Sequence, residues 1–334
     1  MKIKFLALSL LAGLALSAKA EIAETDTFNR FIDKMVKQHG FSETGLRNAF
    51  QTVKIQQSIL DAIAKPAEAK PWFQYREIFM TEARIAGGVQ FWRENESVLQ
   101  SIEQQYGVPA EILIAIVGVE TRYGANIGKY RVIDALSTLG FAYPPRSDFF
   151  LQELENFLLL SRDEAIDPME PMGSYAGAMG LPQFMPSSFR GYAVDFDHDG
   201  KRDIWKNSAD ALAAIANYFV HNHWRSGAPI AFPVQARDQS YKQALSKGVK
   251  PDATIASLRP FLSGIPPQLD NSDSVKLLGF QQVADQELWI GLHNFYVITR
   301  YNHSPLYAMA VYQLSQAIAE RKKQPIAGIT QQPL

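Results

Sequence analysis

The chain has 334 residues, of which 47 % are hydrophobic and 20 % charged, a composition typical of a folded globular protein rather than a disordered one. Its 33 basic and 34 acidic residues leave a net charge of −1, which argues against a nucleic-acid-binding protein because such proteins usually carry a basic excess. Cysteine is absent from the sequence, which excludes disulfides, thiol nucleophiles, cysteine metal ligands and a lipid anchor on a cysteine.

The first twenty residues, MKIKFLALSLLAGLALSAKA, have the pattern of an export signal. Lys2 and Lys4 give the positive start, an apolar stretch begins at Phe5, and a small-x-small cleavage site ends at Ala20. The apolar stretch is shorter than the roughly 20 residues of a confident transmembrane span. We therefore predict that residues 1–20 are a signal peptide and that the protein is periplasmic. The alternative is an uncleaved membrane anchor.

Residues 21–104 are predicted to form an α-helical N-terminal domain. In FNRFIDKMVKQHGF the apolar residues recur at helical spacing and Gly40 ends the helix. The stretch from Pro71 onward, PWFQYREIFMTEARIAGGVQFWRENESVLQSIEQQYG, keeps helical spacing through Leu99. Its aromatic residues are expected mostly in the core.

Residues 105–226 are predicted to form a second helical unit. One helix begins at Pro109 and stops by Gly124, another runs from Asp148 to about Arg162, and NSADALAAIANYFVHNHW reads as a third.

Residues 227–290 are predicted to form a small β domain. The stretches APIAFPVQA, SVKLLGFQQV and ELWIGLHNFYVITRYN carry β-branched and aromatic residues between turn residues. Residues 291–334 return to the helical part and end in the helix SPLYAMAVYQLSQAIAERKK. The predicted fold class is therefore α+β, mostly α.

An acidic residue ends the very apolar stretch ILIAIVGVE. On a helix, Leu113, Val117 and Glu120 share a face, so the carboxyl group projects from the apolar side. Burial raises a carboxyl pKa, which suits a general acid. The same burial is costly for a structural carboxylate unless it is paired, and Arg122 is a candidate partner. From this stretch alone, both interpretations stay open.

The segment DFDHDGKRDIW has the register of a calcium-binding loop. Asp195, Asp197 and Asp199 occupy positions 1, 3 and 5, Gly200 occupies position 6, and Asp203 occupies position 9. Alternating carboxylates at this spacing converge on one ion, so we predict a structural Ca²⁺ site. A solvated acidic turn is the alternative.

The second half of this loop departs from the usual pattern. Position 7 offers the backbone oxygen of Lys201, but position 12 is Lys206, which cannot ligate. Asp210 is the candidate for the closing carboxylate. His221 and His223 lack an evident third ligand, so we interpret them as ordinary helix residues.

Four stretches together carry a family resemblance: ETRYG at Glu120, GSYAGAMGLPQFMPSSF at 173–189, the DFDHDG…DIW loop, and NFYVITRYNHSPLYAMAV at 294–311. In this order they resemble the B-type lytic murein transglycosylases of glycoside hydrolase family one hundred and three. The resemblance spans almost the whole chain after the signal segment. It implies a lysozyme-like core, with the helical N-terminal domain and the small β domain beside it.

The resemblance implies cleavage of the β-1,4 bond between N-acetylmuramic acid and N-acetylglucosamine in peptidoglycan. The muramyl C6 hydroxyl, not water, attacks the anomeric carbon and leaves a 1,6-anhydro end. Most glycosidases use two carboxylates, whereas nothing near Glu120 in the sequence offers an obvious second one. An intramolecular acceptor removes the need to activate water, so Glu120 would serve first as acid and then as base.

The resemblance also implies glycan-binding residues around Glu120. It assigns hydrogen bonds to Ser174 and Gln183, and positions facing the reaction centre to Tyr218 and Tyr301.

Three further positions follow from the same resemblance. Arg146 is expected to meet a peptide-stem or lactyl carboxylate, Tyr75 to stack in the groove, and Met179 to pack under the sugar. The expected partners are peptidoglycan glycan strands, with cell-wall synthases as candidate protein partners and no lipid anchor. We expect a monomer. The rival hypotheses are a muramidase that hydrolyses the same bond and a non-catalytic peptidoglycan-binding scaffold.

Overall fold

A computed structural model of the chain describes residues 25–64 and 70–324. By their internal contacts the residues divide into two compact units, one up to Ile55 and one from Gln56 onward. The predicted signal peptide lies outside the described residues. Among the residues that are described, no helix combines the length and the apolar character that a membrane span requires.

The first unit is a pair of helices, α1 (Asp26–His39) and α2 (Glu43–Phe50). The hydroxyl of Thr25 accepts a hydrogen bond from the Phe28 backbone N–H and begins α1. Gly40 adopts the left-handed conformation and ends it, as predicted. The apolar stripe of α1 is buried, and the rings of Phe28 and Phe50 pack edge to face with centroids 5.2 Å apart.

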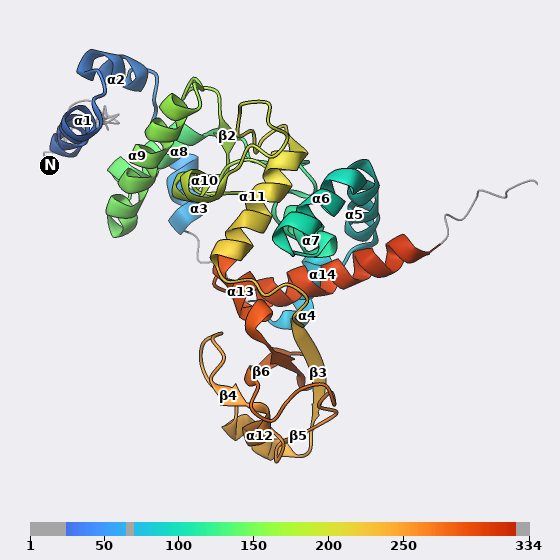
Figure 1. The fold of residues 1–334 in the computed structure, drawn as a ribbon. Coiled ribbons are helices and arrows are strands. Elements are labelled where there is room, and N and C mark those ends of the chain that lie inside the picture. Colours follow the sequence, from blue (N-terminus) through green and yellow to red (C-terminus); the bar gives the residue numbers. More distant parts are fainter. Residues whose placement is uncertain (1–24, 65–69, 325–334) are drawn as a thin grey trace, which may run out of the picture. The chain divides into compact units, whose positions relative to one another are not determined.

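The second unit is mostly helical (Figure 1). Its longer helices are α3 (Gln57–Ala64), α4 (Trp72–Phe79), α5 (Glu82–Glu94), α6 (Glu96–Tyr106), α7 (Ala110–Thr121), α8 (Val132–Ala142), α9 (Ser147–Asp163), α10 (Pro186–Tyr192), α11 (Ser208–His221), α13 (His293–Tyr301) and α14 (Pro305–Lys323). Short elements complete it: the 3-10 turns η2 (Pro144–Arg146) and η3 (Gln239–Gln243), helix α12 (Ile255–Leu258), and the paired strands β1 (Tyr130–Arg131) and β2 (Met172–Gly173).

The predicted N-terminal domain over residues 21–104 differs from this division, because α3 to α6 belong to the second unit. The physical reason is packing: α5 contacts α7 and α14, and α6 contacts α7 and α11. The helical stretch predicted from Pro71 through Leu99 is also interrupted twice. Thr81 accepts a hydrogen bond from the Arg84 backbone N–H and restarts the helix as α5, and Asn95 separates α5 from α6.

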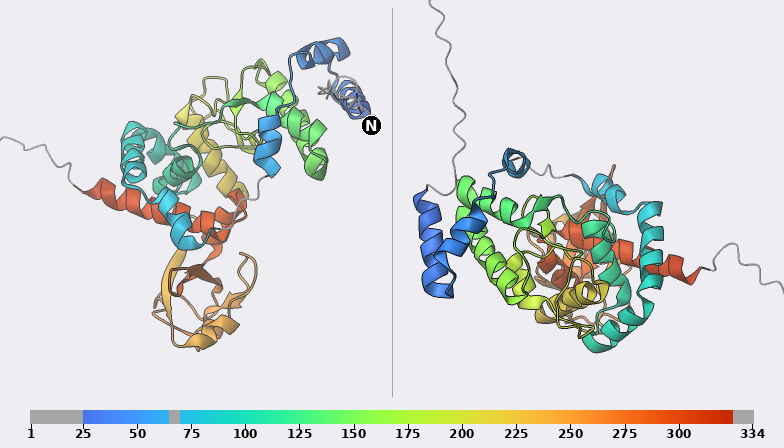
Figure 2. Two further views of the ribbon diagram at one scale, coloured as in Figure 1. Left: turned by 180° about the vertical axis from the view of Figure 1, so that it is seen from behind. Right: turned by 90° about the horizontal axis from the view of Figure 1, so that it is seen from above.

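Helix α7 is the centre of the second unit. Its sequence ILIAIVGV is apolar on every side, so it buries all its faces rather than the single stripe that the spacing suggested. Helix α14 packs along it, and Figures 1 and 2 show the two side by side from the front and from behind. A helix held on all sides keeps its last turn, which carries Glu120, in a fixed place.

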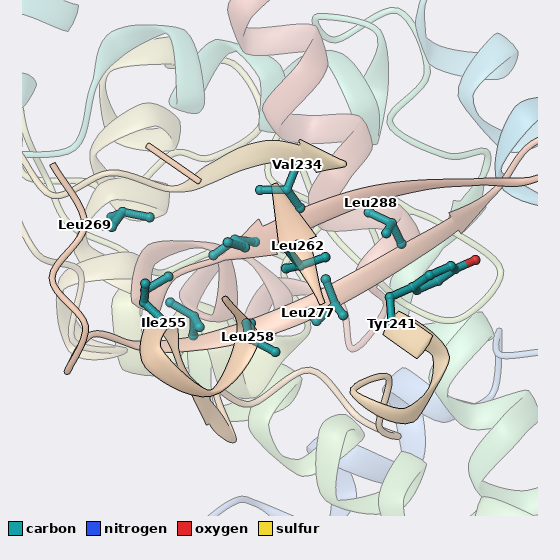
Figure 3. Packing of buried hydrophobic residues seen from close by; sticks show 10 residues of the cluster. Val234, Tyr241, Ile255, Leu258, Leu262, Leu269, Leu277 and Leu288 are labelled. Atoms are coloured by element: carbon teal, nitrogen blue, oxygen red, sulfur yellow. The ribbon is translucent and has the colours of Figure 1, made fainter. Parts of the chain in front are cut away.

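The predicted β domain forms an antiparallel sheet in the order β4-β6-β7-β3-β5. The strands are β3 (Ala231–Ala236), β4 (Ala253–Thr254), β5 (Leu262–Ser263), β6 (Ser274–Gln281) and β7 (Gln286–Gly291). One face covers the buried cluster drawn in Figure 3, to which Val234, Leu277 and Leu288 contribute. The mostly-α, α+β fold class is confirmed.

The strand predicted from ELWIGLHNFYVITRYN ends earlier than its composition suggested. Only Gln286–Gly291 is a strand, and His293–Tyr301 is helix α13. In that helix Asn294, Val297 and Ile298 are buried, at the i, i+3 and i+4 spacing of a helix face. Helical periodicity here prevails over the β propensity of the individual residues.

Candidate active site

Glu120 lies in the last turn of α7, where the chain leaves the helix through Arg122 in the left-handed conformation, with φ 51°. Two side chains fix this helix end. The buried guanidinium of Arg84 on α5 donates a hydrogen bond from Nη1 to the Gly118 carbonyl oxygen at 2.6 Å. The Thr121 hydroxyl reaches the Leu181 carbonyl oxygen at 3.3 Å and so ties α7 to the LPQF segment.

The carboxyl group of Glu120 is mostly buried and has one side-chain hydrogen bond. The hydroxyl of Tyr307 on α14 donates to Oε1 at 2.6 Å. Burial raises the pKa of Glu120 to about 7, although the Tyr307 hydrogen bond acts in the opposite direction. Arg122 is exposed, and in the described parts of the chain it forms no ion pair with Glu120. The structural alternative, a Glu120–Arg122 pair, therefore has no support.

Tyrosines from four helices gather near this carboxyl group. The rings of Tyr301 and Tyr307 stack with centroids 6.4 Å apart and planes inclined by 6°. The charge of Glu120 raises the pKa of Tyr75, Tyr301 and Tyr307, with burial as the larger cause for each. These phenols therefore stay protonated and can donate hydrogen bonds near the acid. Tyr218 completes the cluster, with its ring 5.1 Å from that of Tyr301.

Two of these hydroxyl groups donate hydrogen bonds to backbone carbonyl oxygens of the protein. Tyr301 donates to the Pro182 carbonyl oxygen at 2.6 Å, and Tyr218 donates to the Arg300 carbonyl oxygen at 2.5 Å. The structure thus brings Tyr75, Tyr218 and Tyr301 to the region of Glu120, and their contacts with a glycan stay a prediction. The Tyr301 hydrogen bond joins α13 to the LPQF segment, and the Tyr218 hydrogen bond joins α11 to α13.

Sequence reasoning missed Tyr307, the residue that contacts the acid directly. The sequence offered one signal for Tyr307, its position in the stretch SPLYAMAV one turn after Ser304. The Ser304 hydroxyl accepts a hydrogen bond from the Tyr307 backbone N–H and so begins α14. Sequence reasoning also missed Arg84, for which the sequence gives no comparable signal.

Residues 174–185, between β2 and α10, form a tight loop that passes the end of α7. The Ser174 hydroxyl accepts from the backbone N–H groups of Ala176 and Ala178, at 3.3 and 3.1 Å. Gln183 adopts the left-handed conformation and donates from Nε2 to the carbonyl oxygens of Gly180 and Ile127, at 2.9 and 3.2 Å. Both residues are only partly buried, and their glycan contacts remain a prediction.

Two predicted glycan residues lie differently from expectation. Met179 is fully buried at the centre of the loop, paired with Phe184 through backbone hydrogen bonds, so its side chain cannot meet a sugar from outside. Arg146 is exposed, and its guanidinium lies over the Phe149 and Phe150 rings, 4.4 and 5.1 Å from their centroids. In the described residues no hydrogen bond or ring contact joins Arg146 to the Glu120 cluster.

The predicted calcium loop brings three carboxylates together. Oxygen atoms of Asp195, Asp197 and Asp210 all lie within 4.8 Å of one another. Asp210 is fully buried, and its pKa is raised first by burial and further by the charges of the other two. An all-oxygen, mutually repelling set of this kind fits a hard divalent cation such as Ca²⁺. The carboxylate of Asp199 instead accepts from the Lys201 backbone N–H at 2.9 Å and lies outside the group.

Other predicted positions serve the loop itself. Asp203 accepts from the backbone N–H groups of Trp205 and Lys206, at 2.8 and 2.9 Å, and so forms a turn.

His221 shares a hydrogen bond with the Asn217 carbonyl oxygen one helical turn earlier, as an ordinary helix residue does.

The chain is similar to known proteins over most of its length. The sequence model of the Transglycosylase SLT domain family matches residues 23–316. The chain is 43 % identical over 311 residues to membrane-bound lytic murein transglycosylase B of Escherichia coli K12, covering 90 % of this chain and 84 % of that protein.

Solved structures are similar over the same length. Soluble lytic transglycosylase SltB1 of Pseudomonas aeruginosa, in its catenated form, is 48 % identical with a TM-score of 0.86, covering 89 % of this chain and 98 % of that one. Escherichia coli Slt35 in complex with calcium is 42 % identical with a TM-score of 0.84, covering 91 % and 96 %. Pseudomonas aeruginosa SltB3 in complex with NAG-anhNAM-pentapeptide is 29 % identical with a TM-score of 0.77, covering 88 % and 80 %.

Proposed function

The chain belongs to the Transglycosylase SLT domain family, as a B-type lytic murein transglycosylase that acts on peptidoglycan, and we propose that Glu120 alone carries its acid and base chemistry. The observation that carries the proposal is a mostly buried carboxyl group whose pKa is raised to about 7 beside the Tyr307 hydroxyl. Near neutral pH such a group exists in both protonation states, which one residue needs if it first donates and then accepts a proton.

In the first step protonated Glu120 donates its proton to the glycosidic oxygen that leaves N-acetylmuramic acid, and the bond from that oxygen to the anomeric carbon breaks. In the second step the Glu120 carboxylate takes the proton of the muramyl C6 hydroxyl while that oxygen bonds to the anomeric carbon. The glycan ends in a 1,6-anhydro ring, and the acid regains its proton. Tyr307 would steady the carboxylate between the two steps.

The surroundings of Glu120 favour this scheme over hydrolysis. Hydrolytic glycosidases generally need a second carboxylate. Within the described residues, only burial and the Tyr307 hydroxyl shift the pKa of Glu120, and no neighbouring acid contributes. The SltB3 complex, which contains an anhydro-muramyl ligand, supports the same product for this chain.

The same proposal gives the loop at 195–210 a structural Ca²⁺ ion. Asp195, Asp197 and Asp210 would hold it, and the calcium complex of Slt35 supports this assignment. The ion would offset two of the three negative charges of these carboxylates and fasten the loop to α11. It takes no part in bond cleavage. We also propose export to the periplasm, where the peptidoglycan substrate lies; the segment 1–20 has the composition of a signal peptide.

Product analysis on purified peptidoglycan tests the proposal. Mass spectrometry of the digest should find 1,6-anhydromuramic ends with the native protein and no released fragments with Glu120→Gln. Glu111→Gln is the matched control, because Glu111 also lies on α7, is also partly buried and has a raised pKa. Reducing ends would instead indicate a muramidase, and full activity of Glu120→Gln would indicate that another residue is the acid.

A further inference from the structure

A hollow lies away from Glu120, between α4, α14 and the β sheet. Its volume is about 720 Å³, and its lining includes Arg76, Phe232, Glu287, Trp289, Tyr312 and Gln316. Strands β3 and β7 supply Phe232 and Trp289, which are partly exposed. A hollow of this size accommodates a ligand of several rings.

The hollow and the catalytic cluster use opposite faces of the same two helices. On α4, Phe73, Arg76 and Glu77 share the face that lines the hollow, whereas Tyr75 lies two residues from Phe73, on the other side of the helix. On α14, Gln316 follows Tyr307 by nine residues, which is two and a half turns. The hollow is therefore separate from the site of bond cleavage.

Two of the charged groups that line the hollow are engaged within the protein, whereas Glu77 and Glu320, which also line it, are exposed and form no side-chain hydrogen bond or ion pair with another described residue. Arg76 donates from Nε to the Gln313 amide oxygen at 2.6 Å. Glu287 accepts at both oxygens, from the Gln282 amide and the Trp289 indole N–H, each at 2.7 Å. The two exposed carboxylates of Glu77 and Glu320 can accept hydrogen bonds from the hydroxyl groups of a sugar.

Ring faces and amides remain available to a ligand. The rings of Trp289 and Tyr312 meet at 88° with centroids 6.1 Å apart and form a corner, and Gln316 is exposed beside it. Aromatic rings pack against apolar C–H surfaces, while amides both donate and accept hydrogen bonds. This combination suits a neutral ligand with C–H faces, hydroxyls and acetamido groups, as N-acetylhexosamines have.

We propose that this hollow is a second glycan-binding site, which binds N-acetylhexosamine units of the peptidoglycan strand outside the catalytic site. The choice of glycan rests on the proposed function, but binding here does not require Glu120 chemistry. The site would hold a long strand on the enzyme while the catalytic site cleaves another part of it or a neighbouring strand.

Affinity electrophoresis in native gels that contain glycol chitin, a soluble N-acetylglucosamine polymer, tests the proposal. Glu120→Gln serves as the parent, so that the polymer is not cut. Adding Trp289→Ala should raise the dissociation constant by about tenfold, as is typical when an aromatic anchor is truncated. Gln316→Arg, at an exposed helix position that tolerates the change, should weaken binding in the same direction by filling the hollow.

The matched control is Trp92→Ala. Trp92 is partly buried on α5 beneath the Lys322 ammonium, 4.6 Å from its ring centroid, and does not line the hollow. It should leave the retardation of the parent unaltered. The proposal is overturned if Gln316→Arg, shown by its melting temperature to be folded, binds glycol chitin as the parent does. Failure of the catalytic proposal would appear separately, as native protein that releases no anhydro fragments.

Discussion

Replacing Tyr307 by phenylalanine removes the one side-chain hydrogen bond that Glu120, the proposed catalytic acid, forms with the described residues, and it leaves the ring in place. The Tyr307 hydroxyl donates to Glu120 Oε1 at 2.6 Å, and the ring stacks on Tyr301. Phenylalanine keeps the stacking surface, so the fold and the packing of α14 on α7 should survive. What changes is the relative stability of the two protonation states of Glu120.

The direction of the change follows from the charge that the bond stabilises. A hydroxyl that donates to a carboxylate favours the ionised form, so its loss raises the pKa of Glu120 above about 7. A hydrogen bond to a charged group contributes about 1.5–3 kcal/mol, which corresponds to an increase of roughly one to two in the pKa. In the proposed mechanism the cleavage step requires protonated Glu120. The alkaline limb of the pH–rate profile should therefore move to higher pH by that amount.

The assay is the pH dependence of kcat/KM for peptidoglycan cleavage, which reports the pKa values of the free enzyme. Tyr241→Phe is the control, because Tyr241 lies in the buried core of the β domain and its hydroxyl has no part in the site. An alkaline limb that stays in place in Tyr307→Phe, or moves to lower pH, would refute the account of how the pKa of Glu120 is set.

Three further changes test the structure around the site. Because burial raises the pKa of Glu120 from 4.5 to about 7, the ionised carboxylate destabilises the folded state by up to about 3 kcal/mol above pH 7 and does not destabilise it below pH 4.5. Glu120→Gln should therefore raise the melting temperature at pH 8 but not at pH 4, and equal shifts at the two pH values would contradict this. Asp197→Asn should stabilise the calcium-free protein by relieving repulsion, and it should abolish most of the stabilisation that calcium gives, about 2.7 kcal/mol in the free energy of unfolding at a hundredfold excess over Kd. Asp199→Asn should keep that stabilisation. A chelator that leaves the melting temperature of the native protein unchanged would show that the loop is only a turn. Gly128→Ala should abolish folding or lower the free energy of unfolding by several kcal/mol, because the φ of Gly128 is +103° and a Cβ would lie 1.9 Å from the Gly173 carbonyl oxygen. Gly191→Ala, at a position on α10 where a Cβ meets open space, is the control and should leave thermal unfolding unchanged.

The position of the acid could be predicted because its signal is local. Eight apolar residues before Glu120 require a buried helix, and a carboxylate at its end must then be either paired or protonated. Asp210 could likewise be named as the closing carboxylate of the loop, since α11 begins just after the loop and returns that residue to Asp195 and Asp197.

The partners of the acid could not be predicted from local patterns. Tyr307 meets Glu120 across 187 residues of sequence, and the pairing depends on how α14 packs along α7. Met179 was expected to pack under the sugar, yet the loop folds over it and buries it completely. The packing of α5 against α7 and α14 could not be predicted for the same reason, because α5 has little amphipathic pattern of its own.

The end of α7 shows how the fold protects the proton affinity of Glu120. The carbonyl groups at a helix C-terminus carry partial negative charge and attract cations. Arg84 supplies that cation, but its guanidinium is directed at the Gly118 and Val119 carbonyl oxygens and packs over the Phe79 ring. A guanidinium paired with Glu120 itself would lower the carboxyl pKa and keep it ionised at neutral pH. By binding the backbone instead, Arg84 stabilises the helix end without taking the proton from the acid, and the pKa of Glu120 is left to burial and to Tyr307.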